Sequence, residues 1–210
     1  YGLTETTAPA AGLRPGDLRA GSVGPPIPGT TVRIAEDGEV LVRGVGVFSG
    51  YQNKDEDAGA FTDGFFRTGD LGSLDDAGRL TLHGRRKNLI ITASGKNVAP
   101  EPWEAAVGRS PLVAHAILVG EGRSHLTAAL LVDPDAVRRW AQRSGHHDLA
   151  ALLAQDPPAD GLALTNPALL ARLQRPVDRA NAAVSRAEQV RRFVALLVDT
   201  SYSMDLSGRW

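Results

Sequence analysis

The stretch DGFFRTGDLGSLDDAGRLTLHG, residues 63–84, consists of short apolar segments separated by the turn dipeptides Asp63-Gly64 and Ala77-Gly78. Such spacing is typical of β-strands joined by tight turns. Upstream, TTVRIAEDGEVLVRG (30–44) predicts two alternating strands around Asp37-Gly38, after a glycine- and proline-rich loop. NKDEDAGAF (53–61) favours a short helix. We therefore expect the first part of the chain to be rich in β-structure.

Downstream, the pattern becomes mixed. RLTLHG (79–84) and NLIIT (88–92) predict a second hairpin that straddles the basic run Arg85-Arg86-Lys87. A helix is expected to begin at PEPWEAAVGRS (100–110), followed by two buried strands, AHAILVG (114–120) and LTAALLV (126–132).

Helices are expected to return at PDAVRRWAQRS (134–144) and across residues 166–193, where Pro176 should kink or split the second one. The intervening segment 145–165 suits an extra helix and a loop. The fold class predicted from these patterns is α+β.

Composition excludes several classes of protein. The 210 residues carry 23 basic and 24 acidic side chains, so a formal charge of −1 gives no long-range attraction to nucleic acid. The chain has no cysteine, which excludes disulfides and a thiol nucleophile. The longest apolar runs are too short to cross a bilayer, and no secretory leader precedes them. We expect a cytoplasmic protein without a transmembrane segment.

Two side chains are candidate ligands of a sugar. Asp70 follows Thr68-Gly69 at a strand end, where its carboxylate could accept two hydrogen bonds from a ribose diol. The alternative is an aspartate that caps its own turn. Arg85 offers a guanidinium fork for the same sugar or a phosphate oxygen, or else is a solvated charge.

Other motifs do not qualify as ligand sites. TASGKN (92–97) lacks the first glycine of a phosphate loop, because Ile90 occupies that position. GVGVFSG (44–50) lacks the third glycine of a dinucleotide site. The five histidines are scattered, which argues against a histidine-based metal site.

The motifs YGLTE, GSVGPPIPG, GEVLVRG, FRTGDLG and GRRKNLIITASGKNVAP occur in this order. Together they closely resemble acyl-CoA synthetases of the adenylate-forming superfamily, and most of all long-chain fatty-acid CoA ligases. The resemblance covers roughly residues 1–198. It implies that residues 1–86 are the β-rich end of a large domain. Residues 87–210 would be a small mobile α+β domain, with a sheet of three or more strands, packed helices and a divergent tail at 199–210.

The resemblance also implies the chemistry and the ligands. A fatty acid would react with ATP to an acyl-adenylate, and CoA would then displace AMP. Glu5 would bind Mg²⁺, Thr4 the α-phosphate and Tyr1 the adenine, with Gly2 beside them, while Asp70 and Arg85 would bind the ribose. Glu5, Asp70 and Arg85 would then converge around one adenylate. Substrates would be small molecules, without nucleic acid; peripheral membrane association and oligomeric state stay open.

Two further segments receive roles from the resemblance. Lys87 corresponds to the hinge about which the small domain rotates between the two half-reactions, although it is alternatively a solvated charge. The loop Ser94-Gly95-Lys96 would approach the CoA arm, with Gly95 allowing close backbone contact. The family more often has two glycines where this chain has Ser94-Gly95.

Two departures from the family pattern lead to a further expectation. The family's phosphate loop would lie upstream of Tyr1, and no lysine follows the last strand, since the chain contains only Lys54, Lys87 and Lys96. We expect a truncated or frame-shifted gene, a chain inactive by itself, and exposed sheet edges that favour aggregation. The alternatives are an adenylation domain that loads a carrier protein, a non-catalytic nucleotide-binding remnant and an inert β-rich interaction module.

Overall fold

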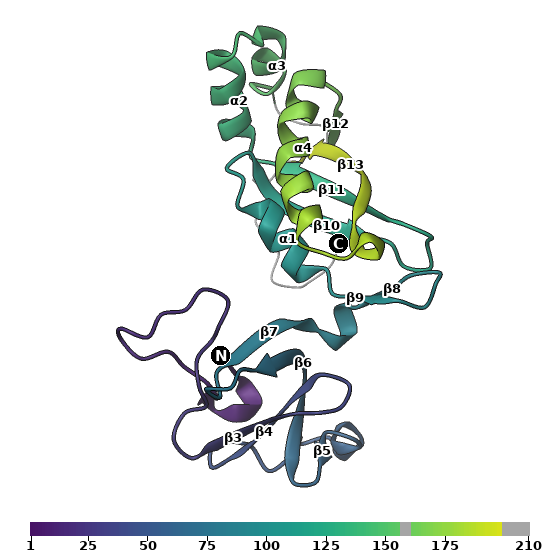
Figure 1. Ribbon diagram of the computed structural model, residues 1–210. Coiled ribbons are helices and arrows are strands. Elements are labelled where there is room, and N and C mark those ends of the chain that lie inside the picture. The colour runs from purple at the N-terminus through teal and green to yellow at the C-terminus, as the bar shows by residue number, and fades with distance from the viewer. Residues whose placement is uncertain (156–160, 199–210) are drawn as a thin grey trace. The chain divides into compact units, whose positions relative to one another are not determined.

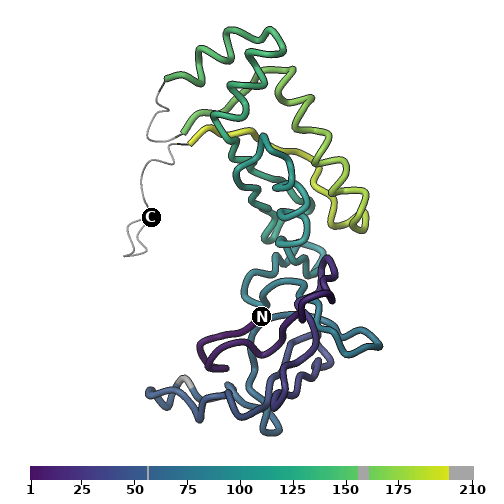
Figure 2. The backbone as a smooth tube through the Cα atoms, turned by 90° about the vertical axis from the view of Figure 1, so that its left-hand side faces the viewer, coloured from purple at the N-terminus to yellow at the C-terminus, as the bar shows by residue number. Residues whose placement is uncertain are grey.

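The computed structural model describes residues 1–155 and 161–198. The chain divides into two compact units, Tyr1–Leu89 and Ile90–Trp210. The elements of each unit are labelled in Figure 1, and the course of the backbone within each can be followed by colour in Figure 2. The predicted divergent tail at 199–210 lies outside the described residues. The α+β class predicted from the sequence is confirmed.

The first unit is built on a five-stranded antiparallel sheet with the order β3-β4-β6-β5, in which β7 also pairs with β6. Its strands are β3 (Thr30–Ile34), β4 (Glu39–Gly44), β5 (Phe61–Thr62), β6 (Phe65–Leu74) and β7 (Leu80–Arg85). The predicted hairpin around Asp37-Gly38 is confirmed, with Ile34 opposite Val40. Gly38 has a φ of +85°, a backbone conformation that residues with a side chain rarely adopt.

Short elements complete the first unit. They are β1 (Gly2–Leu3), η1 (Thr4–Thr6), β2 (Ala8–Pro9), η2 (Lys54–Asp57) and η3 (Arg86–Asn88). The short helix expected within 53–61 is therefore the 3-10 turn η2. The core cluster of this unit is small and consists of Ala10, Ala11, Val32, Val40, Val42 and Leu80; Leu41, Phe65 and Phe66 are buried outside it.

The second unit has a four-stranded sheet with the order β10-β11-β13-β12, in which β11 and β13 are parallel and the other pairs antiparallel. Its strands are β10 (Val113–Val119), β11 (Leu126–Val132), β12 (Leu162–Leu164) and β13 (Val190–Leu197). A separate hairpin joins β8 (Ile90–Ile91) to β9 (Asn97–Val98).

Four α-helices and one 3-10 turn belong to the described part of the second unit: α1 (Glu101–Gly108), α2 (Pro134–Arg143), α3 (His147–Leu152), α4 (Pro167–Ala182) and η4 (Arg186–Glu188). In Figure 1, α1 and α4 lie side by side against the sheet. Trp103 donates its indole N–H to Asn181 Oδ1 at 3.0 Å, which ties the two helices together. Their apolar faces share one large core, where Val107, Leu130 and Leu173 are fully buried.

Two sequence predictions were wrong. The predicted hairpin of residues 79–84 with 88–92 does not form, because β7 pairs with β6 and β8 pairs with β9. The second predicted helix ends at Ala182, and residues 190–197 form β13 instead, because this apolar run pairs in parallel with β11. Pro176 lies inside α4 without dividing it. The buried neighbours Leu173 and Val177 hold the helix to the core across the missing backbone hydrogen bond.

Candidate functional site

Asp70 lies at the centre of a three-residue contact in the first unit. Strand pairing places Asp70 directly opposite Arg85 on β7, and Arg85 Nε lies 2.9 Å from Asp70 Oδ1. The hydroxyl of Tyr1 donates to Asp70 Oδ2 at 2.7 Å. Asp70 is only 5% exposed, whereas the Arg85 side chain is half exposed. The two residues expected to share a ribose are thus in direct contact.

The turn before Asp70 is fixed by hydrogen bonds other than those of its own carboxylate. Thr68 Oγ1 donates to the carbonyl of Val40 at 2.8 Å and accepts the Asp70 N–H at 3.0 Å. Gly69 adopts φ +70°, and its N–H donates to Glu39 Oε1 at 2.9 Å. Since Thr68 and Glu39 hold the backbone, the carboxylate of Asp70 faces Tyr1 and Arg85 rather than capping the turn.

Glu39 is a buried acid, 3% exposed, that supports this turn. Its Oε2 accepts from both Nε and Nη2 of Arg67, at 2.9 and 2.7 Å, and lies 3.4 Å from Arg86 Nη2. The hydrogen bonds of Arg67 to Glu39, together with the charge of that acid, raise the pKa of Arg67. Arg86 also pairs closely with Asp37. The backbone N–H of Glu39 and the charge of Arg86 lower the pKa of that aspartate.

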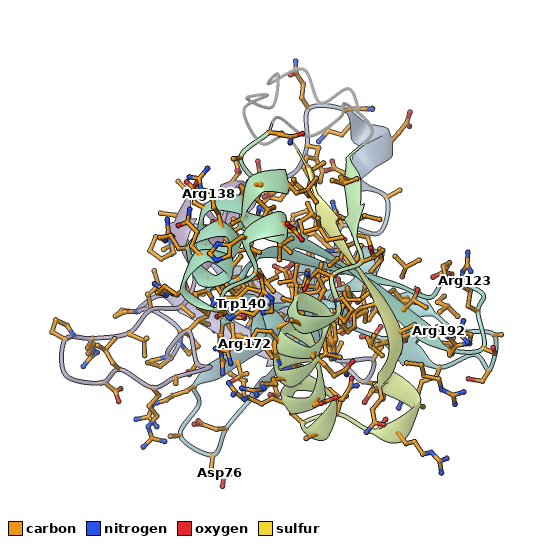
Figure 3. All side chains as sticks on the ribbon, turned by 90° about the horizontal axis from the view of Figure 1, so that it is seen from above. Asp76, Arg123, Arg138, Trp140, Arg172 and Arg192 are labelled. Atoms are coloured by element: carbon orange, nitrogen blue, oxygen red, sulfur yellow. The ribbon has the colours of Figure 1, made fainter. Side chains whose placement is uncertain are left out.

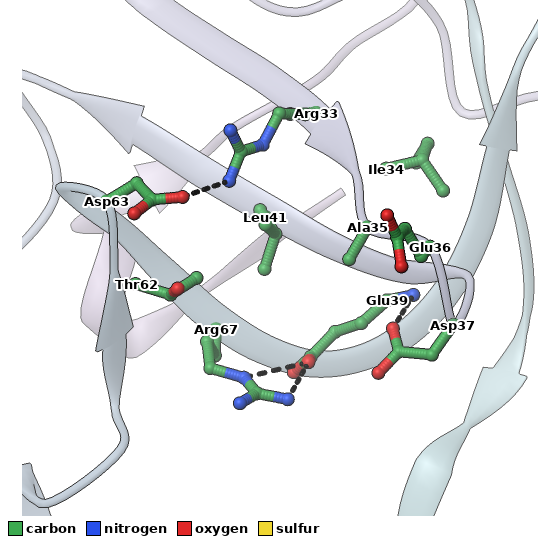
Figure 4. Close-up of a pocket in the computed structure, with 10 residues that line it drawn as sticks. All are labelled: Arg33, Ile34, Ala35, Glu36, Asp37, Glu39, Leu41, Thr62, Asp63 and Arg67. Carbon is green, nitrogen blue, oxygen red and sulfur yellow. Dashed lines mark hydrogen bonds and ion pairs between the residues drawn. The ribbon is translucent and has the colours of Figure 1, made fainter.

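A hollow of about 590 Å³ lies over this network on the strands β3 and β4 (Figure 4). Two ion pairs lie in its wall, Arg33 with Asp63 at 3.2 Å and Arg67 with Glu39, and the acids Glu36 and Asp37 also line it. With four acids and two arginines in its wall, the hollow is a poor match for an anionic ligand. Of its residues, Glu39 supports the Asp70 turn directly, and Arg67 pairs with Glu39.

The N-terminal segment contributes the remaining candidates of the first unit. Burial is the main cause that raises the pKa of Tyr1 above its ordinary value, so the phenol keeps its proton and donates to Asp70. A Cβ on Gly2 would lie 2.5 Å from the carbonyl oxygen of Ala8, so the pairing of β1 with β2 requires glycine there. Thr4 and Glu5 lie on η1, where Thr4 is exposed.

Glu5 Oε1 accepts a hydrogen bond from the hydroxyl of Tyr51 at 3.0 Å. This contact orients the carboxylate while leaving its second oxygen for another partner. Magnesium in proteins commonly takes one or two carboxylates together with phosphate oxygens of the substrate. A half-buried, oriented glutamate fits that role. Within the described residues there is no cluster of three or more acidic or histidine side chains arranged around a metal.

Lys87 is exposed on η3, close to the division of the two units between Leu89 and Ile90. The loop Ser94-Gly95-Lys96 connects β8 to β9 in the second unit. Gly95 closes the turn with φ +77°, and its N–H donates to the Thr92 carbonyl at 2.8 Å. A Cβ at this position would meet nothing within 4 Å, so the backbone conformation alone favours glycine there.

Lys96 is anchored within the second unit. Its Nζ lies 2.7 Å from Ser185 Oγ and 3.2 Å from Glu188 Oε1. Beside the loop lies a cavity of about 350 Å³, with the basic side chains Arg186, Arg191 and His125. Ser94 and Ser124 add hydroxyls to its wall. The cavity suits an anionic group.

Sequence reasoning missed several of these residues. Glu39, Arg67 and Arg86 received no role in the site, although Glu39 opens the apolar run EVLV. An acid at the start of a buried strand requires a charged partner, which was a usable signal. Nothing in the local sequence indicates that Tyr51 contacts Glu5, or that Arg186 and Arg191 share a cavity with Ser94.

The chain is similar to known proteins along most of its length. Residues 1–52 match the family described as AMP-binding enzyme, and residues 87–207 match the AMP-binding enzyme C-terminal domain. The long-chain-fatty-acid–CoA ligase FadD15 of Mycobacterium tuberculosis is 44% identical over 200 residues, covering 95% of this chain and 32% of that protein. Human long-chain-fatty-acid–CoA ligase 6 is 35% identical over 159 residues, covering 69% of this chain and 23% of its own length. The chain thus spans about a third or less of these relatives.

Solved structures support the fold. The O-succinylbenzoate coenzyme A synthetase of Bacillus subtilis, solved with ATP and magnesium ion, superposes with a TM-score of 0.65 at 24% identity, covering 93% of this chain and 37% of that one. MatB of Rhodopseudomonas palustris, solved with ATP, has a TM-score of 0.63 at 26% identity, covering 95% and 36%. The matched residues and the shared fold show that the chain belongs to the AMP-binding enzyme family, of which it carries the C-terminal domain.

Proposed function

We propose that this chain is part of an ATP-dependent acid–CoA ligase, acting on a long-chain fatty acid through an acyl-adenylate. The observation that carries the proposal is the contact of Asp70 with Tyr1 and Arg85 in a chain of this family. The relatives named as long-chain-fatty-acid–CoA ligases support the choice of substrate class.

Asp70 is the proposed ribose ligand. A carboxylate offers about four lone-pair positions; the Tyr1 hydroxyl donates to Oδ2 of Asp70, and Arg85 Nε lies 2.9 Å from Oδ1. The remaining positions can accept two hydroxyl hydrogens of a ribose diol. Because Thr68 and Glu39 hold the turn, the carboxylate is oriented before the nucleotide binds, which lowers the entropic cost of binding.

Thr4 and Glu5 are the proposed contacts to the phosphate end. The exposed hydroxyl of Thr4 would donate to an α-phosphate oxygen, and Glu5 would hold Mg²⁺ while Tyr51 fixes its orientation. Magnesium supplies positive charge that offsets the repulsion between an anionic acid and an anionic phosphate. Gly2 and Tyr1 would form the wall next to the adenine.

The second unit is the proposed CoA side. The loop Ser94-Gly95-Lys96 borders a basic cavity, and the phosphates of CoA are anions that Arg186 and Arg191 can bind through bidentate hydrogen bonds. Lys87 is the proposed hinge: it is exposed, and it lies three residues before the division of the two units at Ile90.

The ribose proposal is tested by comparing AMP with 2′,3′-dideoxy-AMP, which lacks both hydroxyls. We expect the 210-residue chain to bind AMP more tightly, by about tenfold, since a hydrogen bond to a charged group contributes roughly 1.5 kcal/mol or more. Asp70→Asn should abolish this preference in a titration followed by NMR. Asp63→Asn, which removes an exposed carboxylate of the same unit, should retain it. Equal binding of both nucleotides by the unsubstituted chain would refute the ribose role.

The CoA proposal has a separate test. Arg186→Gln with Arg191→Gln should weaken CoA binding in calorimetry by about tenfold, from the loss of charge-assisted hydrogen bonds. Arg192→Gln is the matched control, since Arg192 follows Arg191 on β13 but does not line the cavity. If the control variant loses as much affinity as the double variant, the cavity is not the CoA site.

The hinge is tested by distance measurements in this cysteine-free chain. Cysteines introduced at Asp63 and Gln142 place one spin label on each unit. Lys87→Pro fixes one backbone dihedral, so the distribution of label distances should narrow. Lys87→Ala removes the charge but not the backbone freedom, and it should leave the distribution as it was. If the distance distribution of Lys87→Pro is as broad as that of Lys87→Ala, Lys87 is not the hinge.

The activity of the chain by itself is a further part of the proposal. The chain spans about a third of the FadD15 ligase, and we expect no acyl-CoA formation from ATP, CoA and a fatty acid by the isolated 210 residues. Turnover above background would contradict this expectation. Transfer of an acyl group to a carrier-protein thiol, in place of CoA, would favour the adenylation-domain alternative.

A further inference from the structure

A second basic cavity, separate from the one beside Ser94, lies between the end of α1 and one face of α4. It has a volume of about 240 Å³ and four arginines in its wall. Arg109 follows the last residue of α1, and Arg172, Arg175 and Arg179 come from α4. The buried Leu112 and the half-buried Pro176 supply an apolar floor.

The helix geometry brings these charges close together. Residues separated by three, four and seven positions lie on one face of an α-helix, so Arg172, Arg175 and Arg179 form a single stripe. Like charges at such spacing destabilise a helix by roughly 0.2–0.5 kcal/mol per pair. Asp178, which precedes Arg179, accepts instead from Gln174 Nε2 at 2.7 Å.

No acid neutralises the stripe within residues 1–155 and 161–198. The arginines that form ion pairs in this part of the chain are others: Arg33, Arg67, Arg79, Arg85, Arg86 and Arg138. Arg109, Arg172, Arg175 and Arg179 are all exposed at the cavity. Their guanidinium groups therefore remain available to an external anion.

We propose that this cavity binds a phosphate group. Guanidinium forks match the tetrahedral oxygens of phosphate, and each can donate two parallel hydrogen bonds. Several guanidinium groups around one concave wall match the two negative charges of a phosphomonoester better than the single charge of a carboxylate. The hydroxyl of Ser110 lies in the same wall and adds a neutral donor. The proposal rests on these arginines alone and does not depend on the proposed ligase chemistry.

The test uses the 210-residue chain and a matched pair of triple variants. Arg172→Gln, Arg175→Gln and Arg179→Gln remove three charges from the cavity. Arg138→Gln, Arg139→Gln and Arg143→Gln remove three charges from α2. Figure 3 labels Arg138 on this helix and Arg172 on α4. All six positions lie outside the buried core, so both variants are expected to fold.

The first probe is inorganic phosphate, and its binding is followed by NMR shifts of the backbone amides of residues 109, 110, 112, 172–175 and 177–179. Phosphate should shift these amide signals in the unsubstituted chain and in the α2 variant. The α4 variant should bind phosphate about tenfold more weakly or not at all. Shifts that are absent in the unsubstituted chain, or that weaken equally in both variants, would overturn the proposal.

The second probe separates the sources of the phosphate. Vesicles of phosphatidylcholine with phosphatidic acid are compared with vesicles of phosphatidylcholine alone in a sedimentation assay. Co-sedimentation that depends on phosphatidic acid and is lost in the α4 variant assigns the site to a lipid headgroup. Phosphate binding at the same amides without co-sedimentation assigns it to a soluble phosphate ligand.

Discussion

The two units of this chain hold themselves together by different means. The first unit has six buried apolar residues in its core cluster, and its buried polar side chains include Glu39 and Asp70. Among its described residues, the second has twenty-five buried residues in one apolar cluster, and its ionic contacts, such as Lys96 with Glu188, lie near the surface. In the first unit the candidate site residue Asp70 is therefore itself buried, whereas in the second the loop Ser94-Gly95-Lys96 lies outside the apolar cluster.

The largest effect should come from the core of the second unit. Leu130 lies on the central strand β11 and is fully buried, so Leu130→Ala should cost about 3–5 kcal/mol through lost burial and a residual cavity. Urea unfolding, followed separately by NMR signals of each unit, should show the loss only in the second unit. Ile117→Ala, at an exposed position of β10, is the control and should have a small effect. A shift in both units would show that their stabilities are coupled.

The next effect should come from charge in the first unit. Glu39→Gln keeps an oxygen for the Gly69 N–H but removes the counter-charge of Arg67 and Arg86. Hydrogen bonds to charged groups contribute about 1.5–3 kcal/mol, and we expect a loss of about 2 kcal/mol, because Arg67 is partly solvated. Lys96→Gln is the comparison in the second unit and should cost below about 1 kcal/mol. Equal losses of stability in Glu39→Gln and Lys96→Gln would contradict the proposed difference between the two units.

A smaller effect is expected at the turn before Asp70. Gly69 has φ +70°, and a Cβ added there would lie in open space, so Gly69→Ala meets no clash and introduces only backbone strain. The expected cost is about 1 kcal/mol. Because the turn positions Asp70, AMP affinity should fall as well. Gly59→Ala, at φ +80° and also in open space, is the control: it should lose similar stability and retain AMP affinity.

The smallest effect concerns pH. Burial is the main cause that raises the pKa of Glu104; the Leu118 N–H opposes it, and the charge of Glu101 adds to it. The folded state then binds this proton more tightly than the unfolded chain does. Between the ordinary and the raised pKa, stability therefore falls as the pH rises. Glu104→Gln should remove this slope in denaturation curves of the second unit. Asp148→Asn, at an exposed position of α3, should leave the slope in place.

No helix within residues 1–155 and 161–198 has the length and apolarity needed to cross a bilayer.

Much of the fold could be predicted from the sequence, because it depends on local interactions. The Asp37-Gly38 turn fixes the β3–β4 hairpin, and the Asn166 side chain caps α4 by accepting the Leu169 N–H at 3.1 Å. The family resemblance predicts Asp70 and Arg85 as ligands of one ribose, and their opposite positions on β6 and β7 bring the two side chains together.

Only the tertiary structure decided which segments pair over long distances. Residues 190–197 are apolar enough for a helix or a strand, and the parallel partner β11 makes them β13. The same holds for charge: Glu39 and Arg67 are separated along the chain, and pairing of β4 with β6 brings them together. Turns and caps are encoded within a few residues, whereas strand partners and buried ion pairs depend on surfaces that exist only after the chain has folded.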